Sequence, residues 1–199
     1  RALNSRYGYE TGPYEGYTRA TINEKGLFKL DWNNAAGNTL TATYNFLNAS
    51  RDLDANRCAH GRRGPDAETL QFANSGYTIN NKINAGIVEW NSLFADKFSN
   101  KLQVGYTTYE DFRKPDSAPF PSLLIQRDGT NYIVAGHEPF SINNRLDQNV
   151  LQFTNNLQYF AGKHTWTVGI SLEKFQFDNS FNLGAYPGVF GPVDADAQS

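Results

Sequence analysis

Hydrophobic and polar residues alternate along most of this chain, and this two-residue period predicts β-strands. The clearest stretch is LQYFAGKHTWTVGISLEKF, residues 157–175, in which two alternating runs flank Gly162 and Lys163. No segment shows the period of a convincing amphipathic helix. Six strands are predicted, at roughly 25–34, 38–50, 78–94, 100–112, 147–160 and 164–178.

The connections between these strands alternate between short and long, which predicts three hairpins in an up-and-down antiparallel order. A Gly- and Tyr-rich stretch before the first strand, RYGYETGPYEGYTRA, is expected to form loop, as is the stretch after residue 179. The short connections are 35–37, 95–99 and Gly162-Lys163, and the long ones are 51–77 and 113–146.

The turn at Gly162-Lys163 predicts the register of its hairpin. A two-residue loop with Gly first suits a type II′ turn, which closes Ala161 against His164. Asn155, opposite Ile170, is then the one polar residue on an otherwise apolar face, and a shift of one residue would mix the two faces. The predicted apolar face, which we expect to contact lipid, consists of Leu151, Phe153, Leu157, Tyr159, Trp166, Val168, Ile170 and Leu172.

The first hairpin has the same design, whereas the middle one is ambiguous. A loop of Ala35-Ala36-Gly37, with Gly37 in the left-handed region, places Trp32 opposite Leu40. In the strand at 78–94, one face carries Val88 and Trp90, and the other carries Ile83, Ala85 and Ile87. The sequence leaves open which of these two faces points outward.

An alternating strand can pack its apolar face on a soluble core or against lipid, and three features favour lipid. Several predicted strands exceed the roughly five or six residues usual in soluble sheets and match the roughly 9–11 that cross a bilayer. Tight turns at one end and long loops at the other are typical of outer-membrane barrels. The third feature is aromatic residues near both strand ends, as in two interfacial belts: Trp32, Phe94, Tyr159 and Trp166 near the turns, and Tyr44, Phe46, Phe175 and Phe177 near the opposite ends.

The predicted fold is therefore all-β: an antiparallel up-and-down transmembrane β-barrel segment spanning residues 1–199. Because a closed barrel needs about eight strands or more, six strands would form an arc of a larger barrel. Segments 51–77 and 113–146 would be long extracellular loops, and the short turns would be periplasmic. The alternative is a soluble secreted β-sandwich that binds carbohydrate or protein through its long loops.

The composition of the chain excludes several other kinds of structure and function. The chain is 39% hydrophobic, its mean hydropathy is −0.58, and no run approaches 18 apolar residues, which excludes a transmembrane helix. The 18 basic and 20 acidic residues are mixed along the chain, so no nucleic-acid-binding surface is predicted. Cys58 is the only cysteine, which excludes an internal disulfide. The first residues resemble neither a start site nor a signal peptide, so we expect an excised piece or a mature product.

Candidate metal and catalytic residues are few. The stretch DLDANR, 52–57, begins like a calcium loop, but Arg57 and Arg63 stand where that loop needs Gly and a bidentate Glu. Cys58 and His60 lack a second pair of zinc ligands, and His137 and His164 are expected at opposite ends of the strands. No nucleophile motif is present. We therefore predict no metal, cofactor or catalytic residue, and we do not expect an enzyme.

The most charged part of the first long loop is a candidate ligand site. Arginine forks suit carboxylates and phosphates, and the same side chains could instead pair within the loop and hold GRRGPD in its turns. The candidate residues are Arg57, Arg62, Arg63 and Asp66.

Several stretches resemble the Oar-like branch of the TonB-dependent outer-membrane receptors of Bacteroidota. The resemblance covers most of residues 17–191 in order and is densest in GRRGPDAETLQFANSGYTINNKI (61–83), EPFSINNRLDQNVLQFTNNLQYFAGKHTWTVG (138–169) and EKFQFDNSFNLGAYPGVFG (173–191), with KLDWNNAAGNTLTATYNFLNA (29–49) before them. It implies a plugged barrel of about 22 strands in the outer membrane of a Gram-negative cell. It also implies energised uptake through a TonB complex.

The chain lacks recognisable counterparts of three parts of such receptors. These are the plug domain, the TonB-contacting segment and the terminal strand that closes the barrel. The resemblance therefore implies that the plug, the rest of the barrel and the TonB contact lie in other parts of a parent protein, and that outer-membrane lipid surrounds the wall.

Overall fold

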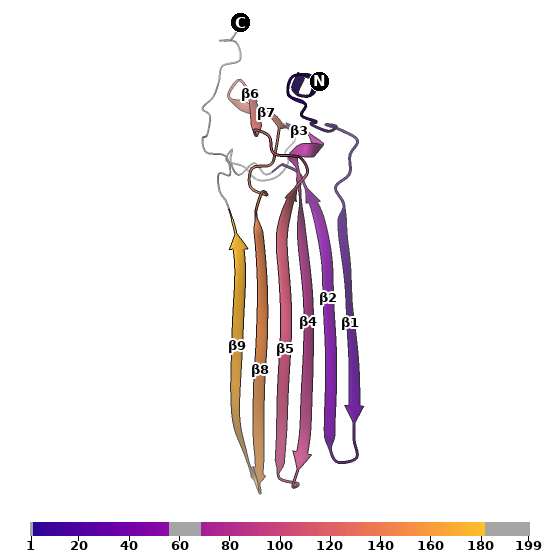
Figure 1. Ribbon diagram of the computed structural model, residues 1–199, viewed down its shortest axis with the longest axis vertical. Coiled ribbons are helices and arrows are strands. Elements are labelled where there is room, and N and C mark those ends of the chain that lie inside the picture. Colours follow the sequence, from indigo (N-terminus) through magenta and orange to yellow (C-terminus); the bar gives the residue numbers. More distant parts are fainter. Residues whose placement is uncertain (1, 56–68, 182–199) are drawn as a thin grey trace.

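The computed structural model describes residues 2–55 and 69–181, and its main feature is one six-stranded antiparallel sheet (Figure 1). The strand order is β1-β2-β4-β5-β8-β9, so neighbours in this sheet follow one another along the chain. The all-β, up-and-down fold predicted from the sequence is confirmed. The strands are β1 (Thr21–Asn33), β2 (Asn38–Leu53), β4 (Tyr77–Phe94), β5 (Phe98–Pro115), β8 (Arg145–Ala161) and β9 (His164–Ser180).

Both predicted hairpin registers are confirmed. In the β8–β9 hairpin, Tyr159 lies opposite Trp166 and Asn155 opposite Ile170, and Gly162 has the positive φ, 62°, that the turn requires. In the β1–β2 hairpin, Trp32 lies opposite Leu40. There the Asn34 N–H donates to the Asn38 carbonyl oxygen at 3.0 Å, and Gly37 has a φ of 78°.

Most strands extend further at the loop end than the alternating pattern predicted. β1 begins at Thr21, β5 continues to Pro115, and β8 begins at Arg145. In these extensions polar residues occupy both faces of the sheet, so hydrophobic and polar side chains do not alternate clearly along the strand. The backbone ladder continues because its hydrogen bonds do not depend on side-chain polarity.

At the loop end, the connections fold into a compact unit that we call the cap, formed by residues 2–20, 69–76 and 116–144 (Figure 1). A second sheet in it has the order β3-β7-β6, with β3 parallel to β7. The sequence pattern predicted none of these elements, because each is too short to show a period. They are α1 (Ala2–Tyr7), β3 (Leu70–Gln71), the 3₁₀ turn η2 (Ala73–Ser75), β6 (Leu123–Arg127) and β7 (Thr130–Ala135).

Buried residues are concentrated in the cap, and few lie in the long strands. Among the described residues of the six long strands, only Tyr77, Gly105, Thr107 and Val150 are buried. Among the same described residues, no helix is both long and apolar enough to cross a membrane. The buried residues of the cap include Tyr9, Thr69, Gln71, Ser75, Val134, Ala135, His137, Glu138 and Ser141.

Candidate membrane interface and loop-side cap

The six-stranded sheet has two chemically different faces, which we call the Trp166 face and the Thr167 face after neighbouring residues of β9. The ladder register assigns every residue of the sheet to one of them. Val88 and Trp90 lie on the Trp166 face, which settles the orientation of β4 that the sequence left open. One cross-strand row of this face consists of Leu30, Ala42, Val88, Val104, Phe153 and Leu172.

In the four inner strands of the sheet, β2, β4, β5 and β8, exposure differs between the faces in a way that separates a membrane wall from a soluble sheet. On the Trp166 face, Val88 is 48% exposed and Leu151 is 47% exposed, whereas Thr107 and Val150 on the Thr167 face are 9% and 5% exposed. This difference is what a sheet curved toward the Thr167 face produces. A soluble sandwich would bury its apolar face against a second sheet, but here the apolar face is the outer, exposed one.

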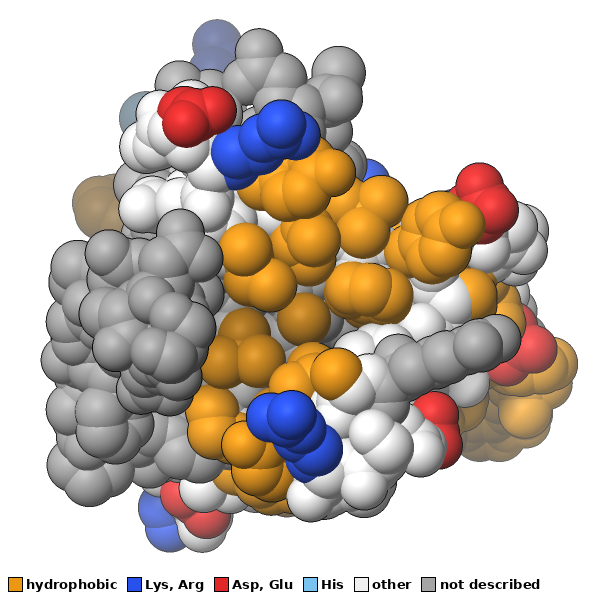
Figure 2. Space-filling view, turned by 90° about the horizontal axis from the view of Figure 1, so that it is seen from above, with side chains coloured by type: hydrophobic (Ala, Val, Ile, Leu, Met, Phe, Trp, Pro, Cys, Tyr) orange, Lys and Arg blue, Asp and Glu red, His pale blue; other side chains and the backbone are white. Residues whose placement is uncertain are grey.

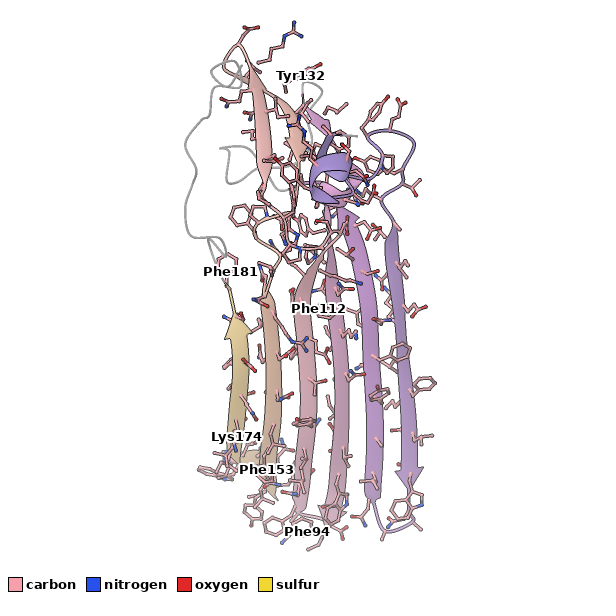
Figure 3. All side chains as sticks on the ribbon, turned by 45° about the horizontal axis from the view of Figure 1, so that its top comes forward. Phe94, Phe112, Tyr132, Phe153, Lys174 and Phe181 are labelled. Carbon is pink, nitrogen blue, oxygen red and sulfur yellow. The ribbon has the colours of Figure 1, made fainter. Side chains whose placement is uncertain are left out.

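Aromatic rings border the apolar band at the end with the short turns. The ring centroids of Phe94 and Phe98 are 5.4 Å apart, and those of Phe98 and Tyr159 are 4.9 Å apart. Trp166 lies opposite Tyr159 and is 66% exposed. Figure 3 shows Phe94 at this end of the sheet.

A second group of rings borders the band on the cap side. Phe28, Tyr44 and Tyr106 share one cross-strand row on the Trp166 face, and Phe46 follows in the next row. The Tyr44 hydroxyl donates to the Asn84 side-chain oxygen at 2.7 Å, so its ring lies in the apolar band and its polar tip reaches a polar row. Tyr106, which the sequence analysis did not include, is 51% exposed here.

Phe175 and Phe177 lie on the other face, so their expected place in an outer aromatic belt does not fit the structure. They are opposite Val150 and Gln148, on the Thr167 face. The register between β8 and β9 is continuous, and Phe175 and Phe177 lie 9 and 11 positions after Trp166. An odd offset along a strand places a side chain on the opposite face. Their ring centroids are 6.0 Å apart.

The Thr167 face carries ladders of polar side chains along its middle rows, as the lumen side of a barrel does. The contacts cross between neighbouring strands and form one polar surface over the sheet. They are Thr41 to Asp31 at 2.6 Å, Lys101 to Glu89 at 2.7 Å, Gln152 to Glu173 at 3.0 Å and Thr154 with Ser171 at 3.2 Å.

An apolar outer band, aromatic borders and a polar inner face are the features of a transmembrane β-barrel wall. The family model described as "Outer membrane beta barrel domain" matches residues 4–192. The chain belongs to this family. It is therefore an outer-membrane protein, and membrane lipid is its surrounding medium. No curated protein and no solved structure matches the chain.

In the cap of this barrel domain, Arg19 joins four segments that are far apart in the sequence. Its Nε lies 3.0 Å from Asp54, its Nη1 lies 2.7 Å from Asp116, and its Nη2 donates to the Ala73 carbonyl oxygen at 2.9 Å. The guanidinium also lies over the Tyr17 ring, 4.9 Å from the centroid. Arg19 thus connects the entry to β1 with η2 and with the ends of β2 and β5.

The Arg19 contacts require the glycine at position 76. A Cβ there would lie 2.3 Å from Arg19 Nη2 and 2.5 Å from the Leu53 carbonyl oxygen. The Gly76 carbonyl also accepts a hydrogen bond from the Asp116 N–H at 3.1 Å. Sequence reasoning missed Arg19 because its partners are 35, 54 and 97 residues away.

Burial changes the ionisation of groups around Arg19. Desolvation raises the pKa of the Asp116 carboxyl, and the hydrogen bond from Arg19 opposes this rise. Desolvation also raises the pKa of Tyr17, and the neighbouring Asp54 carboxylate raises it further.

The carboxylates of DLDANR, the stretch that begins like a calcium loop, are used in protein contacts. Asp52 accepts hydrogen bonds from the Ala20 N–H at 3.1 Å and the Thr78 hydroxyl at 2.8 Å, and Asp54 accepts from Arg19. Within the described parts of the chain, no three His, Cys, Asp or Glu side chains are grouped so that they could hold a metal ion. The remaining candidates lie outside the described residues: Asn56, Arg57, Cys58, His60, Arg62, Arg63 and Asp66.

The cap also buries the adjacent His137 and Glu138, each only 1% exposed. His137 Nδ1 lies 3.1 Å from the Ser117 carbonyl oxygen, and Glu138 accepts a hydrogen bond from the Phe140 N–H at 3.2 Å. Burial lowers the pKa of His137 and raises that of Glu138. These contacts hold residues 136–144 in place within the cap, whereas His164 begins β9 beside the exposed turn at the other end of the sheet.

Seen from above, hydrophobic side chains gather in the middle of the molecule, with charged side chains at the margins (Figure 2). In the cap, Phe120 stacks on Tyr9 with centroids 4.1 Å apart, and Tyr14 packs edge-on against Phe72 at 6.3 Å. Tyr14 and Tyr132 are 53% and 46% exposed. The cap therefore presents aromatic side chains to the outside of the protein.

Proposed function

We propose that this chain forms part of the wall of an Oar-like TonB-dependent outer-membrane receptor, which takes up a ligand with energy delivered by TonB. The motifs at 61–83, 138–169 and 173–191 support this narrower assignment within the barrel family. The folded cap on the loop side supports it as well, because receptors of this type collect their ligands there. No catalytic step is assigned to the chain.

The observation that carries the proposal is the open sheet. Among the described strands, β1 pairs only with β2, and β9 pairs only with β8. In hydrocarbon, each unpaired backbone group costs several kcal/mol, and a closed barrel needs about eight strands or more. Further strands must therefore complete the wall, as the rest of a large receptor barrel would.

A large barrel encloses either an open channel or a plugged lumen. Conductance and TonB binding separate the two, and both can be measured on the full-length parent protein. In planar lipid bilayers we expect no steady ion conductance, because a plug fills the lumen. We also expect the purified periplasmic domain of TonB to bind the protein in detergent. Steady conductance without TonB binding would instead identify an open porin and contradict the proposal.

A further inference from the structure

The polarity of the two faces of the sheet reverses toward the cap. The apolar band on the Trp166 face ends at the row that contains Tyr44 and Tyr106. The next row of that face is mostly polar and contains Asn84, Thr108 and Asn149. At the same height the Thr167 face, which is polar along its middle rows, becomes apolar. Because the lumen side of a barrel is ordinarily polar, this apolar stretch needs an explanation of its own.

Two neighbouring cross-strand rows form the apolar stretch, which we call the inner belt. One row runs from Leu27 on β1 to Phe175 on β9, and the other runs from Lys25 to Phe177 on the same strands. The large apolar side chains of the inner belt are Leu27, Leu47, Ile83, Val150, Phe175 and Phe177.

The inner belt is separate from the packed interior of the cap. The next row toward the cap is largely polar, and in it the Asn81 amide donates to the Asp111 carboxylate at 2.9 Å. Parts of the belt are open to a ligand, since Leu27 is 62% exposed and Tyr109, on the inner strand β5, is 39% exposed. The belt therefore lies between the polar middle rows and the cap, on the lumen side of the wall.

Part of the inner belt forms a hollow of about 510 Å³ on β1, β2 and β4. This volume falls within the range of small-molecule sites, roughly 300–1,000 Å³. Leu27, Leu47 and Ile83 provide its apolar surface, and Asn45 and Lys25 provide polar groups. The strand that pairs with β1 in the complete wall lies beside it, about 4.8 Å away in the plane of the sheet. That strand borders the hollow and does not cover it.

The charge in the inner belt indicates what kind of ligand it fits. Lys25 is the only charged residue in the two rows, and it lines the hollow. Lys29, the next lysine on this face of β1, is paired with Asp31 at 3.1 Å. Lys25 forms no ion pair with any residue that the structure describes. An apolar surface with one unpaired cation complements a ligand that has an apolar body and one anionic group.

We propose that the inner belt binds the apolar body of an anionic, amphiphilic ligand, and that the Lys25 ammonium pairs with the acidic group of this ligand. A ligand that enters from the cap side meets the inner belt before it meets the polar middle rows. The proposal rests on the uptake function proposed above and names the chemical class of the ligand.

Photo-crosslinking of the full-length protein in lipid nanodiscs, without TonB, tests the proposal. The probe is decanoate with a diazirine at the end of its chain, and the corresponding neutral amide is the comparison. Residue-resolved mass spectrometry should find label on the inner-belt residues of β1, β2 and β4. Label on the Trp166 face reports probe dissolved in the lipid and serves as the internal reference. The ratio of inner to outer label should be about threefold higher for decanoate than for the amide, the size expected for one exposed ion pair.

Three variants identify the groups that hold the probe. Lys25→Gln should lower the decanoate ratio about threefold and leave the amide ratio unchanged. Lys29→Gln is the matched control, because Lys29 lies on the same face of the same strand and is already paired with Asp31. This variant should label as the wild type does. Leu47→Asn should lower the ratio for both probes about tenfold, because it removes an apolar contact with the chain.

The same ratios can overturn the proposal. Equal decanoate ratios in Lys25→Gln and Lys29→Gln would do so, as would equal ratios for the two probes in the wild type. Unchanged labelling of Leu47→Asn would exclude the inner belt as the binding surface. The conductance and TonB measurements do not involve this surface. A protein that binds TonB but takes no label on the inner belt would therefore refute the ligand class and leave the receptor assignment standing.

Discussion

Single residues in the cap hold together segments that the chain separates widely. Arg19 contacts Asp54, Asp116 and Ala73, and Gly76 leaves the space that its guanidinium occupies. Charge-assisted hydrogen bonds are stronger than neutral ones. The position of the cap on the sheet therefore depends strongly on this one side chain.

Gly76→Ala should loosen the cap. The added methyl group would overlap Arg19 Nη2 and the Leu53 carbonyl oxygen, and overpacking of this kind costs about 1–3 kcal/mol. Hydrogen exchange should show faster exchange at the amides of Gly76 and Asp116. Gly86→Ala is the control, since a Cβ at that position would have no heavy atom within 4 Å. Equal protection in the two variants would show that Arg19 does not hold the cap.

Glu138→Gln should stabilise residues 136–144 at neutral pH. Burial raises the pKa of Glu138 above its ordinary value of 4.5, so the folded state favours the protonated form. The stability it contributes is present below that value and is lost as the pH rises through the raised pKa. A glutamine is neutral throughout. Protection factors at pH 5 and pH 7.5, corrected for intrinsic exchange, should fall with pH in the wild type more than in the variant.

The contribution of His137 to stability has the opposite pH dependence, and comparing the wild type with Glu138→Gln cancels it. Its lowered pKa means that its contribution is present above the ordinary value of 6.5 and is lost as the pH falls. This contribution is common to the wild type and Glu138→Gln, so the difference between them reports Glu138. Parallel pH dependences of protection in the two proteins would show that the ionisation of Glu138 does not destabilise residues 136–144.

At the scale of strands and turns, much of the sheet could be predicted from the sequence, because the two-residue period and the turn residues carry the information locally. Gly162 specified the β8–β9 register, and Gly37 specified that of β1–β2. The orientation of β4 could not be predicted, since both of its faces carry apolar residues. The predicted place of Phe175 in the outer aromatic belt was wrong. That prediction used only the closeness of the residue to the strand end and not the face of the sheet on which it lies.

The cap could not be predicted, for a different physical reason. Its elements are too short to show a period, and its contacts join distant residues such as Arg19 and Asp116. The candidate ligand residues Arg57, Arg62, Arg63 and Asp66 lie outside the described residues, so their proposed role stays a prediction.

Ile170→Arg should destabilise the wall strongly. Ile170 lies on the Trp166 face, within the apolar band, where we expect lipid, and an arginine there costs about 2–4 kcal/mol near the middle of the bilayer. Thr167→Arg, on the opposite face of the same strand, should cost much less. Urea unfolding of the full-length protein in lipid vesicles measures both. Similar costs for the two variants would mean that the Trp166 face does not contact lipid.

At the scale of the whole molecule, the two ends of the sheet differ completely. One end has three tight turns, and the other carries a folded cap (Figure 1). Outer-membrane barrels place short turns in the periplasm and long loops outside the cell. We therefore expect the cap to face the medium.

Labelling of intact cells with a membrane-impermeant maleimide tests this orientation. In a Cys58→Ser background, Arg127→Cys at the end of β6 should be labelled, whereas Lys163→Cys in the β8–β9 turn should be labelled only after the outer membrane is permeabilised. Both positions are exposed, so accessibility alone does not separate them. Labelling of Lys163→Cys in intact cells would show that the short turns, and not the cap, face the medium.

The continuous ladders of the sheet also determine how this protein responds to mechanical force. The β4–β5 ladder runs without a bulge from the pair Tyr77–Pro115 to the pair Phe94–Phe98. A pull along the strands would load all the hydrogen bonds of this ladder in shear at once, so they must yield together. The cap is held by separate contacts such as those of Arg19, which can yield one after another. Under tension, the cap would therefore detach while the wall keeps its shape.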